Sequence, residues 1–266
     1  MTDAAYLRDI QYKNDSNLAA RQALYRFQQP SMPIWSLAMD LAELRGDEAV
    51  LEVGCGNGGY LGVLHQRQHR GLVCGLDLAP GMLPAAHGRA PDASLMIGDA
   101  TCVPFADDSF ACVLAMHMLY HVPDRRAAIG ELRRVLRGSG VALVLTNGMQ
   151  HLAELDDLVA AATKEVLSTE VRPMQRGQER FNVEGAPAQL APFFTSVELH
   201  EMNSELLITE IEPLLAYVRS MRTVLMQPDA AVGEAVVDAV EGRARALLAD
   251  QGVVRARTVV GCFVCR

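Results

Sequence analysis

The chain has 266 residues, of which 50% are hydrophobic, 21% are charged and 5% are aromatic. This composition predicts one large folded domain, or a core domain with a modest second lobe, and excludes disordered, collagen-like and disulfide-scaffold proteins. The formal charge of −8, without any basic run, argues against nucleic acid and anionic membrane surfaces as partners.

The cysteines and the N-terminus indicate a cytoplasmic protein. No basic segment followed by an apolar one precedes the fold, and the apolar stretch at 113–120 is less than half of a bilayer span. The cysteines lie mostly in apolar stretches, as free thiols in a reducing compartment do. Cys262 and Cys265 are three apart on an expected strand and point to opposite faces, which favours core packing over a redox role. The six are Cys55, Cys74, Cys102, Cys112, Cys262 and Cys265.

In chain order, the first 45 residues are mainly helical in pattern, and strands then alternate with helices. Asp124 is the expected N-cap of a helix at 125–136, whose apolar residues follow the 3.6-residue period. Strands alternating with helices of this length predict a parallel, doubly wound sheet. The five expected strands of this region are 49–53, 72–76, 94–97, 110–115 and 141–145.

Beyond residue 150 the pattern is more helical, with strands at 197–202 and 258–264 and helices at 211–223 and 230–250 between them. The whole pattern predicts an α/β fold with a doubly wound, mostly parallel seven-stranded sheet and helices on both faces. The expected organisation is an N-terminal helical lid at 1–45, a ligand-binding core at 46–150, and the remainder of the sheet at 151–266, with a helical cap inserted around 205–252.

The strand at 49–53 runs into a glycine cluster and then a helix. Missing side chains in such a turn let a ligand lie against the backbone, and the helix N-terminus presents unpaired N–H groups. Gly54, Gly56 and Gly59 match G-x-G-x-x-G, a spacing that taken alone suggests a dinucleotide.

Three acidic residues follow or close successive strands around this turn. Glu52 would repel a pyrophosphate but suits a ligand with positive charge, such as S-adenosylmethionine. Asp77 ends the second strand, where an acid accepts both ribose hydroxyl hydrogens. Asp99 follows the third strand, where it can accept from an adenine amino group. The alternative is that all three are ordinary surface-turn acids.

With these residues in place, the chain resembles the small-molecule branch of the class I S-adenosylmethionine-dependent methyltransferases. The matching stretches occur in family order between about 50 and 146. They are LEVGCGNG at 51–58, GLDLAPGML at 75–83, GDA at 98–100, VPFADDSF at 103–110, MHMLYHVPD at 116–124 and ELRRVLR at 131–137.

The resemblance implies a Rossmann-like core that binds S-adenosylmethionine through the turn, the acids and the N-terminal helices. Asp77 would hold the ribose, and Leu78 and Met82 would flank the adenine. A separate hypothesis is that the N-terminal helices close over the cofactor, with Arg21 near its carboxylate. The full expected set is Tyr12, Arg21, Glu52, Gly54, Cys55, Gly56, Asn57, Gly58, Asp77, Leu78, Met82, Asp99, Ala100 and Met116.

His117, Tyr120 and His121 lie where the fourth strand leaves the sheet, on the expected ligand side. His117, where the family often has Asn, is the first candidate for a general base. The alternatives are a substrate-shaping role for His117 and a backbone hydrogen bond for His121 at the helix entrance. Their spacing of four could suit zinc on a helix, but no third ligand stands out, so no metal is expected.

The function expected from these residues is methyl transfer from S-adenosylmethionine to a small organic acceptor by in-line displacement, in bacterial secondary metabolism. Two alternatives remain open: an oxidoreductase that binds a nicotinamide dinucleotide, and a non-catalytic S-adenosylmethionine-binding protein. The expected partner is a small-molecule acceptor, and the expected assembly is a monomer or homodimer.

Overall fold

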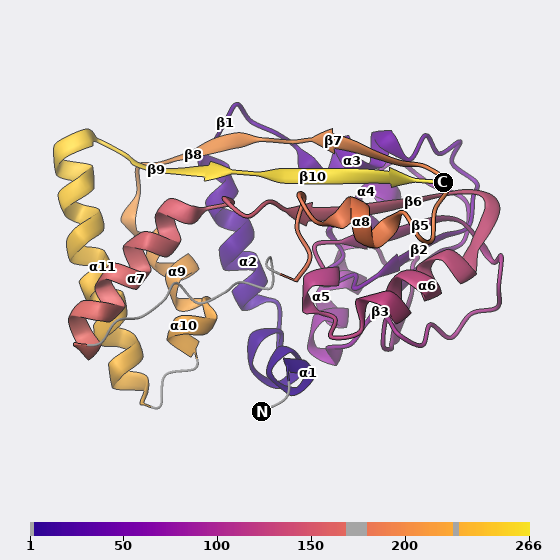
Figure 1. The fold of residues 1–266 in the computed structure, drawn as a ribbon. Coiled ribbons are helices and arrows are strands. Elements are labelled where there is room, and N and C mark those ends of the chain that lie inside the picture. The colour runs from indigo at the N-terminus through magenta and orange to yellow at the C-terminus, as the bar shows by residue number, and fades with distance from the viewer. Residues whose placement is uncertain (1–2, 169–179, 226–228) are drawn as a thin grey trace.

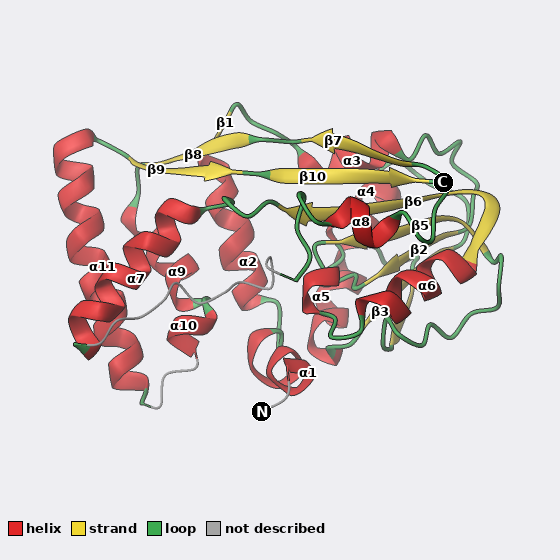
Figure 2. Cartoon of the chain, in the orientation of Figure 1, coloured by secondary structure: helices red, strands yellow, loops and turns green. Residues whose placement is uncertain are grey.

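The computed structural model describes residues 3–168, 180–225 and 229–266. Figure 1 shows two lobes side by side. The lobe built on a long sheet is called the larger layer below, and the lobe rich in helices is called the smaller layer. Figure 2 shows that the two sheets are joined along the top of the molecule, where β9 lies in line with β10 and β8 with β7. None of the helices within the described ranges is long and apolar enough to cross a membrane.

The larger layer confirms the predicted seven-stranded, mostly parallel sheet. Its strand order is β4-β3-β2-β5-β6-β10-β7, and β10 runs antiparallel to both of its neighbours. β2 pairs in parallel with β3 and β5, so the carboxyl ends of these three strands open onto the same edge, and the strand order reverses between β2 and β5. The strands are β2 Val50–Val53, β3 Val73–Asp77, β4 Ser94–Ile97, β5 Phe110–Met116, β6 Leu136–Asn147, β7 Val197–Glu201 and β10 Val260–Cys265.

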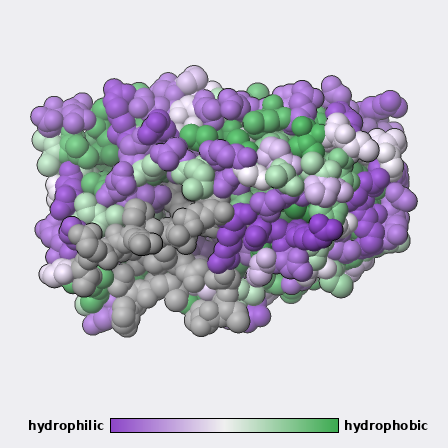
Figure 3. Space-filling model, in the orientation of Figure 1, coloured by the Kyte–Doolittle hydropathy of each residue, from purple (hydrophilic) through white to green (hydrophobic). Residues whose placement is uncertain are grey.

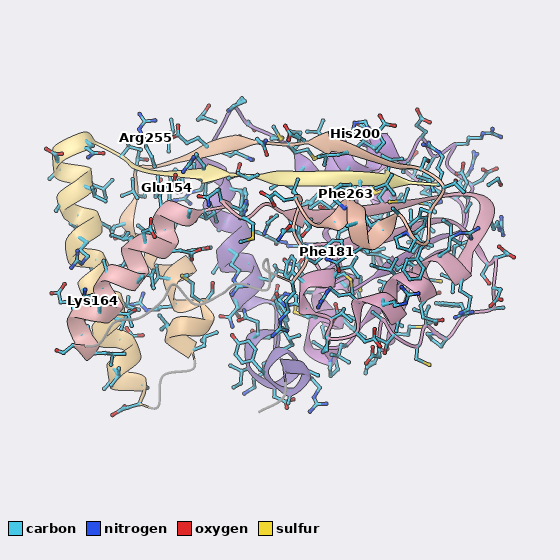
Figure 4. The ribbon with its side chains drawn as sticks, viewed as in Figure 1. Glu154, Lys164, Phe181, His200, Arg255 and Phe263 are labelled. Carbon is cyan, nitrogen blue, oxygen red and sulfur yellow. The ribbon has the colours of Figure 1, made fainter. Side chains whose placement is uncertain are left out.

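Helices cover both faces of this sheet because its central strands are apolar on both sides. One face packs on α6, the other on α3 and α4. Phe181 and Phe263, labelled in Figure 4, are fully buried in the first of these cores. Cys262 and Cys265 belong to opposite cores, as the strand alternation predicts. The helices are α3 Ile34–Leu41, α4 Gly59–Gln66, α5 Leu83–Arg89, α6 Arg125–Val135 and α8 Ala186–Leu190.

The N-cap prediction for α6 is confirmed. The Asp124 side chain accepts a hydrogen bond of 3.0 Å from the backbone N–H of Ala127, one of the donors that the first helical turn leaves unpaired. The helix after Asp77 is short, because a 3-10 turn at Pro80–Met82 comes before α5.

The smaller layer has its own apolar core and a three-stranded antiparallel sheet that the sequence pattern did not predict. The strand predicted at 258–264 corresponds to β10, and a further strand that was not predicted, β9, ends at Thr258 just before it. The cap predicted as helical contains β8, which pairs with β1 and β9. The elements are β1 Gln28–Gln29, α7 Ala153–Leu167, β8 Ser204–Ile208, α9 Ile211–Arg219, α10 Arg222–Leu225, α11 Ala230–Gln251 and β9 Val254–Thr258.

The N-terminal segment forms α1 (Asp3–Tyr6), a π-helical turn (Leu7–Gln11), α2 (Ser16–Ala23) and a 3-10 turn (Leu24–Phe27). α2 lies between the two layers and packs on α9 (Figure 1). Hydrophilic residues cover much of the described part of the face drawn in Figure 3.

Candidate functional site

The glycine turn joins β2 to α4 and is held against β3. The backbone N–H groups of Gly54 and Cys55 both donate to the carbonyl of Leu76, at 2.7 and 3.0 Å. Gly58 has a φ of +77°, and a Cβ there would lie 2.8 Å from the Cα of Ala86. Only glycine combines this left-handed backbone with so close an approach, so α4 begins directly behind the turn.

Glu52, on β2, is a buried carboxyl with an incomplete set of hydrogen bonds. Its side chain is 2% exposed, and Oε2 finds no hydrogen-bond partner among the described residues. Burial raises the pKa of Glu52 well above its usual value, the charge of Asp77 adds to this, and the backbone N–H of Leu61 opposes it. Such a group is suited to a bound molecule that carries positive charge.

Asp77 ends β3, the strand next to β2. Its Oδ2 accepts from the N–H of Gly56 at 2.7 Å, and its Oδ1 accepts from the N–H of Ala79 at 2.8 Å. Burial raises the pKa of Asp77, and these backbone donors oppose the shift. Glu52 and Asp77 therefore lie within electrostatic range of each other on one edge of the sheet, beside the glycine turn.

Asp99 lies just past the end of β4, the strand that pairs with β3. It is exposed, and its Oδ1 accepts from the backbone N–H and the hydroxyl of Thr101 at 2.8 and 2.7 Å. Four other residues that the sequence places at the cofactor site are more buried, with exposed fractions between 1% and 8%: Cys55, Met82, Ala100 and Met116. Glu52 is thus buried and Asp77 nearly so, whereas Asp99, one residue beyond the Gly98 N–H that donates to the carbonyl of Asp77, is exposed.

The N-terminal helix α2 covers the glycine turn. Gln22 and Asn57 exchange side-chain hydrogen bonds of 3.0 and 3.4 Å, and a Cβ on Gly56 would lie 3.3 Å from Leu18. Arg21 donates to the hydroxyl and the carbonyl of Ser220, the residue that follows α9. Arg21 therefore contacts the smaller layer, and it also acts on Tyr12, which lies within electrostatic range of Asp77.

His117 stands at the point where β5 leaves the sheet. Its backbone N–H donates to the carbonyl of Leu145 at 2.8 Å, and its φ is +55°. Burial lowers the pKa of His117 to about 4, so the imidazole is neutral at pH 7.

Tyr12 and His121 form a second polar contact beside this point. The Tyr12 hydroxyl lies 3.1 Å from Nε2 of His121, and the rings of Tyr120 and His121 meet edge to face at 4.5 Å. Burial raises the pKa of Tyr12, and the nearby Arg21 opposes this shift. The side chain of His121 thus contacts the hydroxyl of Tyr12, a residue 109 positions away in the sequence.

Two further polar features were missed in the sequence. His151 is 3% exposed; its Nδ1 accepts from the N–H of Val259 at 3.1 Å, and its Nε2 lies 3.0 Å from the Tyr25 hydroxyl. An accepting Nδ1 carries no hydrogen, so Nε2 donates to Tyr25. The other feature is Tyr60, whose hydroxyl is buried without a hydrogen-bond partner in the described part of the chain. In the sequence, the position of Tyr60 directly after the glycine cluster could have marked it as a candidate site residue.

Metal-ligating side chains do not gather at this edge. Across residues 3–168, 180–225 and 229–266, no group of three or more His, Cys, Asp or Glu side chains is arranged to hold a metal ion.

Comparison with known proteins matches residues 51–144 to the family model described as a methyltransferase domain. The malonyl-[acyl-carrier protein] O-methyltransferase of Serratia marcescens is 36% identical over 110 residues, which are 41% of this chain and 42% of that protein. The phthiotriol/phenolphthiotriol dimycocerosates methyltransferase of Mycobacterium tuberculosis is 38% identical over 97 residues, 36% of each chain. The matches span between 21% and 43% of the length of the first curated relatives.

Among solved structures, the fold is similar to that of a candidate methyltransferase from Bacillus halodurans. The TM-score is 0.59 at 19% identity, and the alignment covers 88% of this chain and 98% of that one. At this identity the likeness concerns the fold, and it extends beyond the matched domain to both layers.

Proposed function

On the premise that this chain carries a class I S-adenosylmethionine-dependent methyltransferase domain, we propose that it transfers a methyl group from S-adenosylmethionine to a small organic acceptor. The acceptor's nucleophilic atom attacks the methyl carbon in line with the carbon–sulfur bond. In such a displacement the protein mainly aligns the two reactants and excludes water.

The observation that carries this proposal is the buried Glu52 carboxyl beside Asp77, behind the glycine turn. A pyrophosphate at this position would meet two acidic side chains, whereas a sulfonium nucleoside with an α-ammonium group would meet a complementary charge. The literal glycine spacing favours a dinucleotide, but the acids beside it favour a cationic ligand without phosphate.

The residues present fit S-adenosylmethionine, since an orphaned carboxylate oxygen and a glycine cradle lie at one sheet edge. Glu52 and the turn would hold the amino-acid end. Asp77 would hold the ribose through the second lone pair of each oxygen, with Leu78 and Met82 beside the adenine. When bound, the cofactor supplies an electrophilic methyl carbon. Asp99 remains our candidate for the adenine amino group.

His117 is our candidate for orienting the nucleophile. An imidazole with a pKa of about 4 is neutral at pH 7 and accepts a hydrogen bond, but it retains a proton poorly. It would hold an O–H or N–H nucleophile in line. Tyr120 and the Tyr12–His121 pair would line the same side of the site.

The setting we propose is the cytoplasm of a bacterium that makes secondary metabolites. All six cysteines are free in the structure, which suits a reducing compartment. The net charge of −8 favours a small-molecule acceptor over nucleic acid, and we propose that the chain acts as a monomer or homodimer.

The test is calorimetric titration of the purified protein with S-adenosylhomocysteine and, separately, with NAD⁺. We expect saturable binding of the first and none of the second. Glu52→Gln should weaken binding of S-adenosylhomocysteine, while Glu43→Gln, at an exposed carboxyl paired with Arg266, should not. Binding of NAD⁺ alone would contradict the proposal.

A further inference from the structure

A second buried polar atom lies beside Glu52, and the mechanism above does not use it. Tyr60 is the second residue of α4, its side chain is 5% exposed, and its hydroxyl has no hydrogen-bond partner among the described residues. Burial raises the pKa of Tyr60 well above its usual value, and Glu52 is the first of the nearby groups that add to this shift. The two groups also lie on one face of β2: Tyr60 packs in one core with Val50, which points to the same side of the strand as Glu52, and the backbone N–H of Leu61, the next residue after Tyr60, donates to Glu52.

The ring of Tyr60 is fixed by its surroundings. The left-handed Gly58 starts α4, and a Cβ on Gly59 would lie 2.9 Å from the Trp35 ring. Trp35 and Tyr60 meet edge to face at 6.5 Å, and the rest of the Tyr60 ring packs in the core over β5 and β6. A phenylalanine would fill this apolar position equally well. Because a buried hydroxyl without a partner costs stability, packing does not explain why the position holds a tyrosine.

We propose that the Tyr60 hydroxyl is a second hydrogen-bonding group, beside Glu52, for the amino-acid end of S-adenosylmethionine. The inference rests on the proposed function and extends it by a residue. The amino-acid end is a zwitterion, whose ammonium needs acceptors and whose carboxylate needs donors. A carboxylate supplies only acceptors, whereas a phenol supplies both a donor and an acceptor.

The position of Tyr60 favours this end of the cofactor over the nucleoside. Asp77, on the neighbouring strand β3, is the group suited to the ribose, and β4 with Asp99 lies beyond it. Glu52, on β2, is on the other side of Asp77, next to β5. A hydroxyl that neighbours Glu52 is thus on the methionyl side of the ribose site.

The experiment compares two ligands by calorimetry, S-adenosylhomocysteine and 5′-methylthioadenosine. Both contain the adenine, the ribose and a thioether, but only the first has the amino-acid end. Tyr60→Phe should bind S-adenosylhomocysteine about ten- to a hundredfold more weakly and 5′-methylthioadenosine as the wild type does. The matched control is Tyr217→Phe, which removes a hydroxyl from a buried tyrosine of the smaller layer and should change neither affinity.

A thermal melt of the ligand-free Tyr60→Phe protein separates binding from folding. The melting temperature should be unchanged or higher, because the substitution removes a buried hydroxyl without a partner. The inference is overturned if Tyr60→Phe binds S-adenosylhomocysteine normally, if it loses both ligands equally, or if its melting temperature falls. A wild-type protein that binds neither nucleoside would instead contradict the proposed function.

Discussion

Arg21 holds the end of α9: its guanidinium donates to the hydroxyl of Ser220 at 3.1 Å and to the carbonyl of Ser220 at 2.6 Å. Ser220 is 1% exposed, so these bonds satisfy polar groups that water does not reach. The next residue on α2, Gln22, bonds to Asn57 in the glycine turn. Two consecutive residues of α2, Arg21 and Gln22, therefore connect the smaller layer with the glycine turn.

Arg21→Ala should lower the free energy of unfolding by about 1–3 kcal/mol, because a buried carbonyl and hydroxyl lose a charged donor. The looser α2 should also weaken binding of S-adenosylhomocysteine. Urea denaturation and calorimetry measure the two effects. Arg26→Ala is the control: Arg26 forms an exposed ion pair with Glu210, worth less than about 1 kcal/mol. Equal losses for the two variants would contradict a special role for Arg21.

Gly58→Ala tests the shape of the glycine turn. The new methyl group would meet the backbone of Ala86 at 2.8 Å, and alanine disfavours a φ of +77°. We expect a loss of about 2–4 kcal/mol in the free energy of unfolding, measured by urea denaturation. Gly242 is exposed inside α11 with nothing within 4 Å, so Gly242→Ala should instead add about 0.5–1 kcal/mol. A tolerated Gly58→Ala would mean that the turn can open.

The features that the sequence predicted correctly are local or follow from one rule of topology. A buried strand that ends in glycines leads into the turn, and parallel strands bring their carboxyl ends to one edge, so Glu52 and Asp77 lie within electrostatic range of each other. The cap of α6 by Asp124 is likewise encoded within four residues.

The features that the sequence did not predict depend on distant contacts. β1 has two residues and is defined by its pairing with β8, about 180 residues away. Tyr25 and His151 are 126 positions apart, so their contact needs the packed tertiary structure. Tyr60 lies in an apolar helix pattern, where a tyrosine is normally a core residue. Only the folded structure shows that its buried hydroxyl has no hydrogen-bond partner among the described residues.

Glu52 should make stability depend on pH. The pKa of Glu52 in the folded state is raised above its usual value of 4.5. The contribution of Glu52 to folding stability is therefore fully present below pH 4.5 and is lost as pH rises through the folded-state pKa. Ligand-free Glu52→Gln, which cannot ionise, should therefore be more stable than the wild type in alkaline buffer, and the difference should shrink toward pH 4.5. Urea denaturation across this range measures it, with Glu43→Gln as the control. A constant difference would contradict a buried, protonated Glu52.

Ligand binding should release the proton of Glu52. An ammonium beside this side chain favours the carboxylate, so S-adenosylhomocysteine should bind more tightly as pH rises. Calorimetry in two buffers with different ionisation enthalpies counts the protons released. We expect proton release with S-adenosylhomocysteine and none with 5′-methylthioadenosine, which has no ammonium group. Equal release with both ligands would assign the proton to another residue.

His117 provides the corresponding test on the acceptor side. Its pKa is lowered from 6.5 to about 4, so its contribution to stability is present above pH 6.5 and is lost as pH falls toward 4. His117→Asn should remove this loss of stability at acidic pH, whereas His87→Asn, at an exposed position, should leave it unchanged. Urea denaturation at pH 7 and pH 5 measures the difference.

The same low pKa limits what His117 can do in methyl transfer. A general base suited to neutral pH has a pKa near 7, and removing one costs about 10²–10⁴-fold in rate. If His117 only orients the nucleophile, His117→Asn keeps a hydrogen-bonding side chain there and should lose less than about tenfold. An NMR titration of the imidazole decides between the two roles without a known acceptor. A midpoint near 4 supports orientation, whereas a midpoint near 6.5 would restore His117 as the base.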